Sequence, residues 1–165
     1  MASNKHDSNN FAISEFTLDN FLPYQVAVLA ENMNHSFSRV YSDRFGITIS
    51  EWRVLAQLNH RSPLSAQEVG KLTNMDKPRV SRALVKLSKS KLVIRKENRE
   101  DRRVAVLKLS KKGKKLMQDI IPHAIEWQNN LENLVSKNAI NDLSKLCKTF
   151  RISFKKNLND FSQQL

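Results

Sequence analysis

The stretch Asp76-Lys-Pro-Arg-Val-Ser-Arg-Ala-Leu-Val-Lys-Leu-Ser-Lys89 decides the fold, because its side chains divide into an apolar stripe and a basic face. Asp76 suits the N-cap of a helix, and Pro78 falls in the first turn, where proline is tolerated. We therefore predict a helix from about residue 77 to residue 89. Its apolar stripe has the three- and four-residue spacing of an amphipathic helix and consists of Val80, Ala83, Leu84 and Leu87.

The same region holds the excess positive charge of the protein. The 165 residues include 28 Lys and Arg against 16 Asp and Glu, a formal net charge of +12. Sixteen of these basic residues, but only three acidic ones, lie between Lys77 and Lys115. A basic block within a nearly neutral frame is typical of a surface that binds a polyanion, although a solvated charged face would give the same pattern.

Two shorter helices are predicted before this basic helix. Thr48 and Glu51 have the spacing of a capping box, and so do Ser65 and Glu68, which start a helix that reaches Thr73. Further upstream, residues 19–45 carry a long amphipathic pattern that ends at a glycine, Gly46. Two short helices followed by a basic one indicate a helix-turn-helix.

A β-hairpin and two long helices are predicted after the basic helix. Two runs rich in β-branched residues, 93–96 and 103–109, flank a polar segment that forms the hairpin tip. Ser110 is placed to cap a helix that Pro122 should bend, and a last helix begins near Asn138. The apolar faces of the long helices favour a homodimer, with a monomeric core as the alternative for the stripe from residue 143 to residue 161.

Two segments resemble the MarR family of transcription regulators. The run Val93-Ile-Arg-Lys-Glu-Asn-Arg-Glu-Asp-Arg-Arg103, followed by Leu109-Ser-Lys-Lys-Gly113, is similar to the wing signature of that family. Trp52-Arg-Val-Leu55 is similar to its second helix. The resemblance covers about residues 24–160. It implies a mainly α fold with a small β-hairpin wing, in which a winged helix-turn-helix domain is flanked by N- and C-terminal dimerisation helices.

The resemblance also suggests how the chain is organised. We expect an N-terminal arm over residues 1–17, either flexible or docked on a partner, a winged helix-turn-helix DNA-binding domain over 47–110, and a helical dimerisation region made of 18–46 and 111–165. Lys91 departs from the pattern, since the family usually has glycine between the basic helix and the wing. A non-glycine residue in a left-handed conformation costs about 1 kcal/mol, so the geometry of this turn is open.

The positions that lie off the apolar stripe of the basic helix predict contacts to double-stranded DNA. An arginine can bond guanine through two hydrogen bonds in the major groove, and a serine can reach a base edge or a phosphate. We expect base contacts from Arg79, Ser81 and Arg82. Ser65 and Gln67 can offer backbone N–H groups and side chains to a phosphate. The remaining outward positions on the basic helix are Lys77 and Lys86.

The hairpin tip is a second predicted contact. An arginine there can enter the narrow, electronegative minor groove, and Arg103 is the first choice. By resemblance, Asp101 would orient this arginine through a charge-assisted hydrogen bond. Arg99 and Arg102 would then serve the neighbouring phosphates. The alternative is a salt-bridged turn with no role in DNA binding.

A small-molecule effector is also implied by the resemblance, bound between the dimer-forming helices and the DNA-binding lobe. The cationic and aromatic residues there would suit a small aromatic or carboxylate ligand. Arg39 as an interdomain salt-bridge partner and Trp52 as a core residue are open alternatives. The expected lining is His35, Ser38, Arg39, Trp52 and Arg53.

Other functions have little support in the sequence. The chain has 3 glycines and no phosphate-binding loop or nucleophile motif, so we expect no enzyme and no cofactor. The 4 histidines are scattered, and His123 with Glu126 is a weak pair, so we expect no metal. Cys147 lies on an apolar stripe, which favours an inert core cysteine over a redox sensor. Without a signal peptide or a membrane helix, the protein should be cytoplasmic.

These inferences combine into one expected function. The chain should be a sequence-specific transcription regulator, and more specifically a repressor that a small ligand releases from a pseudo-palindromic operator. The alternative is a ligand-independent architectural DNA-binding protein with little sequence preference.

Overall fold

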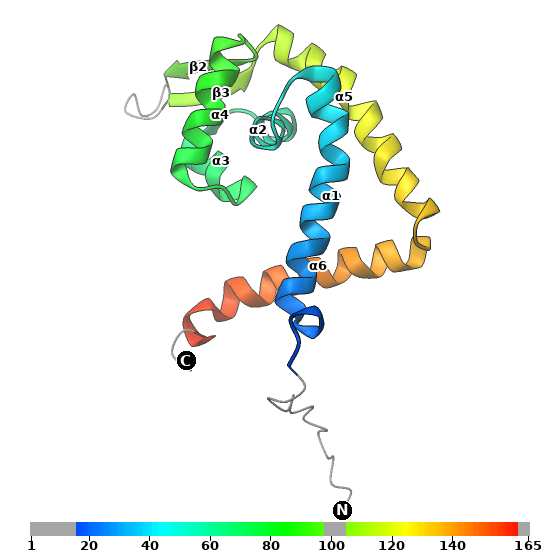
Figure 1. Cartoon of the computed structure of the whole chain (residues 1–165). Coiled ribbons are helices and arrows are strands. Elements are labelled where there is room, and N and C mark those ends of the chain that lie inside the picture. The colour runs from blue at the N-terminus through cyan, green and yellow to red at the C-terminus, as the bar shows by residue number, and fades with distance from the viewer. Residues whose placement is uncertain (1–15, 98–104, 162–165) are drawn as a thin grey trace, which may run out of the picture. The chain divides into compact units, whose positions relative to one another are not determined.

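The computed structural model describes residues 16–97 and 105–161, and the chain forms two compact units, residues 1–49 and 50–165. The first unit contains a short 3-10 helix, η2 (Leu18–Asn20), and the long helix α1 (Leu22–Phe45), drawn in blue to cyan in Figure 1. Gly46 ends α1 with a left-handed φ of 63°, and its N–H donates to the carbonyl of Ser42 at 2.8 Å. This confirms the predicted helix end at Gly46.

The second unit follows the predicted order of elements, with one short strand added (Figure 1). The mainly α fold with a small sheet is confirmed. The elements are α2 (Ile49–His60), β1 (Leu64–Ser65), α3 (Ala66–Thr73), α4 (Lys77–Lys89), β2 (Val93–Glu97), β3 (Ala105–Leu109), α5 (Lys111–Asn130), the 3-10 helix η3 (Leu131–Asn133) and α6 (Lys137–Phe161).

The three strands form one antiparallel sheet in the order β1-β3-β2. In the hairpin, Val93 pairs with Leu109 and Arg95 pairs with Leu107. On the other side of β3, Leu64 pairs with Leu107. The sequence did not indicate β1, because two residues are too few to show the alternation of a strand. This strand ties the start of α3 to the hairpin.

The core of the second unit is formed by apolar side chains from α2, α3, α4, the sheet and the first half of α5. Val54, Leu55 and Val69 are fully buried, and so is Ile120. On α4 the predicted stripe is confirmed, because Val80, Ala83 and Leu87 are buried and Leu84 is half-buried. The opposite side of α4 is therefore left to solvent.

Three helices in this unit begin as the sequence predicts. The N–H of Arg79 donates to Oδ1 of Asp76 at 2.7 Å, and the N–H of Gly113 donates to the hydroxyl of Ser110 at 2.9 Å. At α3 a capping box forms: Ser65 N–H donates to Glu68 Oε2 at 2.7 Å, and Glu68 N–H donates to Ser65 Oγ at 3.2 Å. Hydrogen bonds to the Glu68 carboxyl from Ser65, that of the Ser65 backbone N–H foremost, hold the pKa of Glu68 below its usual range.

A clasp of backbone and side-chain hydrogen bonds joins the end of α4 to the start of α5. Lys91 has a left-handed φ of 59°, its N–H donates to Ser88 O at 2.9 Å, and Leu92 N–H donates to Leu87 O at 2.9 Å, which is a Schellman motif. From the other side, the Ser110 hydroxyl donates to Lys91 O at 2.7 Å. The turn therefore keeps the left-handed conformation that glycine usually supplies.

The start of α5 completes this clasp. The backbone N–H of Ser110 donates to Leu92 O at 3.0 Å, and Lys112 Nζ donates to Ser90 O at 3.1 Å. A Cβ at Gly113 would overlap the carbonyl oxygen of Leu92, so glycine permits the close approach. These hydrogen bonds between the C-terminus of α4 and the N-terminus of α5 hold α4, β2 and α5 in one arrangement.

The last helix, α6, packs little of its surface against the chain. None of its described side chains, over residues 137–157, is buried. No described residue of its apolar stripe is buried, and Cys147, expected in a core, is exposed. Within the described ranges, no helix combines the length and the apolar character needed to cross a bilayer.

Replacing Lys91 by glycine should stabilise the protein. Lys91→Gly removes the cost of a Cβ in the left-handed region. The greater entropy of glycine in the unfolded chain offsets part of this benefit, so we expect the free energy of unfolding to rise by about 1 kcal/mol. Urea denaturation at a fixed protein concentration measures it. Asn74→Gly is the matched control, because Asn74 also has a positive φ, of 53°, but asparagine tolerates this region. An equal gain in both variants would contradict the explanation.

The capping box at α3 should make part of the stability acid-sensitive. The folded-state pKa of Glu68 is lowered, so its contribution is present above the ordinary glutamate pKa of about 4.3 and is lost as the pH falls through the lower, folded value. Between pH 6 and pH 3, Glu68→Gln should therefore lose less free energy of unfolding than the wild type. Glu132→Gln, at an exposed glutamate outside the box, is the control and should behave like the wild type.

Candidate nucleic-acid interface

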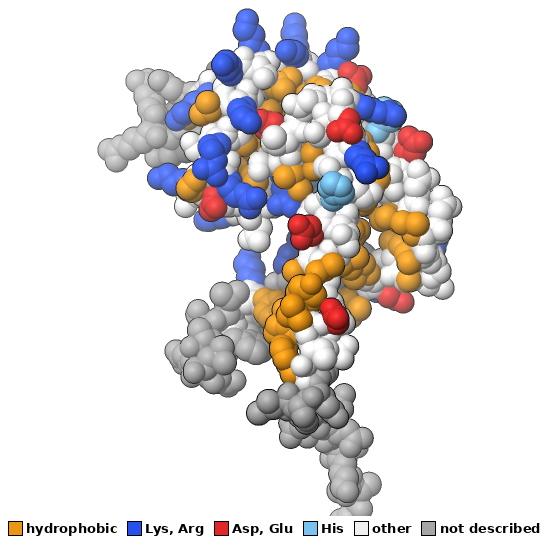
Figure 2. All heavy atoms as spheres, viewed as in Figure 1, with side chains coloured by type: hydrophobic (Ala, Val, Ile, Leu, Met, Phe, Trp, Pro, Cys, Tyr) orange, Lys and Arg blue, Asp and Glu red, His pale blue; other side chains and the backbone are white. Residues whose placement is uncertain are grey.

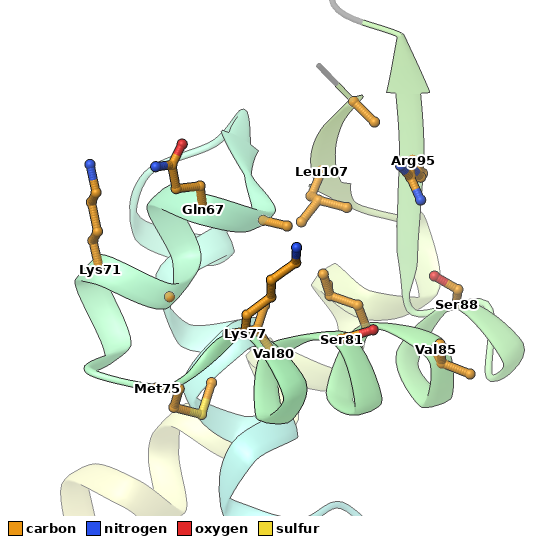
Figure 3. Close-up of a pocket in the computed structure, with 14 residues that line it drawn as sticks. Gln67, Lys71, Met75, Lys77, Val80, Ser81, Val85, Ser88, Arg95 and Leu107 are labelled. Atoms are coloured by element: carbon orange, nitrogen blue, oxygen red, sulfur yellow. The ribbon is translucent and has the colours of Figure 1, made fainter. Parts of the chain in front are cut away.

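A groove runs along one flank of α4, between this helix, α3 and the hairpin (Figure 3). Its volume is about 1080 Å³. Buried and half-buried apolar residues form its floor, while polar and charged side chains stand on its walls. The lining residues are Ala66, Gln67, Gly70, Lys71, Met75, Lys77, Val80, Ser81, Leu84, Val85, Ser88, Arg95, Ala105 and Leu107.

Three elements each contribute one cation to this groove. Lys71 comes from α3, Lys77 from α4 and Arg95 from β2, and all three side chains are exposed (Figure 3). None of the described residues that line the groove is acidic. Figure 2 shows Lys and Arg gathered over the part of the second unit that carries α4 and the hairpin. The groove is therefore a cationic surface with an apolar floor.

The first turn of α4 places positive charge where a helix disfavours it. Lys77 and Arg79 lie there beside one carboxylate, that of the N-cap Asp76, which accepts from the N–H of Arg79 at 2.7 Å. A cation near a helix N-terminus is unfavourable by about 0.3–1 kcal/mol, because the free N–H groups carry partial positive charge. The two exposed cations attract an anion. This arrangement therefore favours an anionic partner over a contribution to the stability of α4.

The predicted contact residues of α4 divide between two flanks of the helix. Lys77 and Ser81 line the groove, together with Gln67 of α3. Arg79, Arg82 and Lys86 are exposed but do not line it, so they occupy the rest of the outward face. The helix thus presents one row toward the groove and one row away from it.

Ser65 was predicted to offer its backbone N–H and its side chain to a phosphate, but in the structure both take part in hydrogen bonds with Glu68. Its backbone N–H is already used in the capping box, and its Oγ accepts from Glu68 N–H. Like the Ser65 backbone N–H, the Ser65 side chain lowers the pKa of the Glu68 carboxyl through a hydrogen bond, so Ser65 is engaged within the capping box. Gln67, two residues into α3, lines the groove and is exposed.

Two groove cations, Lys71 and Arg95, are absent from the sequence-based prediction. Both could have been found from periodicity. Lys71 lies four residues after Gln67 and therefore shares its helix face. Arg95 lies two residues after Val93 on β2 and therefore shares its strand face. The hairpin strand contributes a cation to the groove as well as supporting its tip.

The hairpin-tip predictions concern a segment that the structure does not describe. Arg99, Asp101, Arg102 and Arg103 all lie within residues 98–104, outside the described ranges. Their proposed roles remain predictions.

The residues predicted to bind an effector lie in both units. His35, Ser38 and Arg39 are on α1, where the Ser38 hydroxyl donates to the His35 carbonyl at 2.6 Å. Trp52 and Arg53 are half-buried on α2. Their joint role as a ligand site remains a prediction.

The residues considered for metal binding form a pair and not a cluster. His123 Nδ1 lies 3.6 Å from Glu126 Oε2 on α5. Among the described residues, no group of three or more His, Cys, Asp or Glu side chains is arranged to hold a metal ion.

Comparison with known proteins connects this geometry to a family. The model of the MarR family matches residues 45–104. The regulator MhqR of Bacillus subtilis (strain 168) is 32% identical over 84 residues, which cover 50% of this chain and 58% of the relative. The chain spans less than two thirds of the length of the curated relatives that it matches.

Solved structures extend the likeness beyond the matched segment. A MarR/EmrR family regulator from Acinetobacter sp. ADP1 has a TM-score of 0.76 and 27% identity, covering 86% of this chain and 99% of that one. BpsR of Bordetella bronchiseptica, described in a study of how 6-hydroxynicotinic acid regulates its DNA binding, has a TM-score of 0.75 and 18% identity, covering 82% and 96%. The fold, the matched segment and these relatives lead to one conclusion: residues 45–104 match the MarR family of transcriptional regulators, and the chain is similar in fold to regulators of that family.

Proposed function

We propose that this protein is a sequence-specific regulator that binds double-stranded DNA with α4 in the major groove. The observation that supports this most is the meeting of Lys71, Lys77 and Arg95, from three elements, around one groove beside the outward face of α4. A helix fits the major groove of B-DNA, which is about 12 Å wide. Repression is the mode of regulation that we propose.

The two flanks of α4 suggest a division of roles in the complex. Arg79, Ser81 and Arg82 would reach base edges, where arginine can form two hydrogen bonds to guanine. The groove cations would hold the sugar-phosphate backbone that passes between α4 and the hairpin, since phosphate contacts set register but carry no sequence information. We assign the minor-groove contact to Arg103, oriented by Asp101, with Arg99 and Arg102 on phosphates.

A homodimer is part of the proposal, because both units expose apolar helix faces. On α6, Leu146 is 54% exposed and Phe150 is 47% exposed, one turn apart on the same side. On α1, Val26 is 54% exposed. Such stripes are costly in water, and a second copy of the chain can cover them. Two copies would place two α4 helices on successive major-groove faces of a pseudo-palindrome.

A small aromatic carboxylate is the effector class that we propose. The support is the relative BpsR, whose DNA binding is described as regulated by 6-hydroxynicotinic acid. The dimer would have one conformation whose α4 helices fit the DNA and another whose α4 helices do not. A ligand that binds the second conformation more tightly weakens DNA binding by its difference in affinity for the two conformations. The residues proposed for this site are His35, Ser38, Arg39, Trp52 and Arg53.

Selection from a random duplex library, followed by competition, tests the function. At about 150 mM salt, the selected site should bind roughly 1,000-fold or more tightly than a scrambled duplex of the same length. Equal affinity for both duplexes would overturn the proposal and would favour an architectural protein that coats DNA.

Arg82 and Lys71 should affect DNA binding in different ways. Arg82→Ala should weaken binding to the selected site by about 5- to 150-fold and relax the preference at one base pair, because a base contact is lost. Lys71→Ala should weaken binding to all duplexes alike and lower the slope of log K against log salt by about 1 per subunit. Fluorescence anisotropy titrations over a range of salt concentrations measure both.

The matched control for these titrations is Lys137→Ala, which removes an exposed cation at the start of α6, away from the groove. It should leave the preference and the salt slope close to wild type. A uniform effect of Arg82→Ala over all sequences would instead identify Arg82 as a phosphate contact.

Leu146→Asp should dissociate the dimer, because it places a charge in the apolar stripe of α6. Sedimentation equilibrium measures the mass. Asn141→Asp adds the same charge on the other side of α6 and should leave the mass of the dimer unchanged. A wild-type protein that sediments as a monomer at micromolar concentration would contradict the proposal.

A further inference from the structure

The outward face of α4 contains an isolated aliphatic side chain, Val85. It is 64% exposed, whereas the other valine of the helix, Val80, is 3% exposed in the core. Apart from Pro78 in the first turn, the exposed residues of α4 are all polar or charged: Lys77, Arg79, Ser81, Arg82, Lys86, Ser88 and Lys89. Val85 is therefore a single apolar patch in the middle of a basic surface.

Val85 has no evident role in the stability of α4. It lies outside the buried stripe, and a β-branched residue is a poorer helix former than the lysine or arginine that fills most of this face. An aliphatic group in water gains nothing from the hydrophobic effect until a partner covers it. Its position favours a role in binding.

Val85 follows Ser81, which we assign to base readout, along the edge of the groove whose cations we assign to the sugar-phosphate backbone. Ser81 lies one helical turn before it and Ser88 three residues after it, and all three line the groove. Figure 3 shows Val85 on α4 between these two serines. Four residues along a helix span about 6 Å, so Ser81 and Val85 would meet different base pairs, whose spacing is about 3.4 Å.

Base edges in the major groove offer one apolar feature, the 5-methyl group of thymine. The other exposed atoms are hydrogen-bond donors or acceptors, and covering them with an isopropyl group leaves them without a partner. A valine among serines and arginines therefore favours thymine at the base pair that it covers. It disfavours cytosine, which has a donor and no methyl group.

We propose that Val85 is a specificity-determining residue that contacts the 5-methyl group of a thymine in each half of the binding site. The inference rests on the proposed function, with α4 in the major groove. It adds a base preference that none of the arginines of α4 provides.

Removal of single methyl groups from the DNA tests this directly. In the selected duplex, each thymine is replaced in turn by deoxyuridine, which pairs identically but lacks the 5-methyl group. For the wild type, one symmetric pair of replacements should weaken binding about fourfold per half-site, the value of one buried carbon. In Val85→Ala and Val85→Thr the same replacement should have a smaller effect, because alanine is shorter and threonine keeps only one of the two methyl groups. A double-mutant cycle isolates the contact.

Two controls keep the result interpretable. Val85→Thr keeps the shape of the side chain, and unchanged melting temperatures show that each variant is folded. Ile94→Ala removes an exposed aliphatic residue of β2, 42% exposed, and should keep the full thymine effect. One outcome is that the wild type binds the selected site tightly while the loss of each thymine methyl group weakens the wild type and the Val85 variants equally. In that case the inference about Val85 is wrong and the DNA-binding function stands. If no sequence is selected at all, both are wrong.

Discussion

The arrangement of the DNA-binding unit depends on the clasp between the end of α4 and the start of α5. Lys91 takes a left-handed conformation, its carbonyl accepts the Ser110 hydroxyl, and the carbonyl of Leu92 accepts the backbone N–H of Ser110. Gly113 lets the two segments approach this closely. Because the same few residues end α4, begin β2 and cap α5, the position of the helix relative to the hairpin is set there.

Charge is the second constraint on this unit. The first turn of α4 carries Lys77 and Arg79 at the end where a helix disfavours cations. The groove beside it gathers Lys71 and Arg95 without an acidic neighbour among its described lining residues. Such a surface lowers its free energy when a polyanion supplies the missing negative charge. The apolar floor of the groove and the exposed Val85 add shape and base preference to this general attraction.

Much of this architecture could be predicted from the sequence, and what was missed has physical reasons. The caps at Ser65, Asp76 and Ser110 are local, so the residue types and their spacing suffice to predict them. The pairing of β1 with β3 and the groove cations Lys71 and Arg95 arise from tertiary contacts between distant segments. Cys147 was misplaced because an amphipathic stripe does not reveal whether the same chain or a second copy covers it. Lys91 shows that a costly conformation persists where surrounding hydrogen bonds determine it.

The central claim, that α4 lies in the major groove of a specific site, is tested most directly by DNA cleavage from a reagent on α4. In a Cys147→Ser background, Ser81→Cys provides a single thiol for an iron–EDTA reagent that cleaves nearby DNA. The account predicts two clusters of cuts on the selected duplex, related by its two-fold axis and about 10 base pairs or a multiple of this apart. A thiol introduced at Lys137 should give no such pattern. Tight binding with no cuts from position 81, or equal cuts from both positions, would contradict the account.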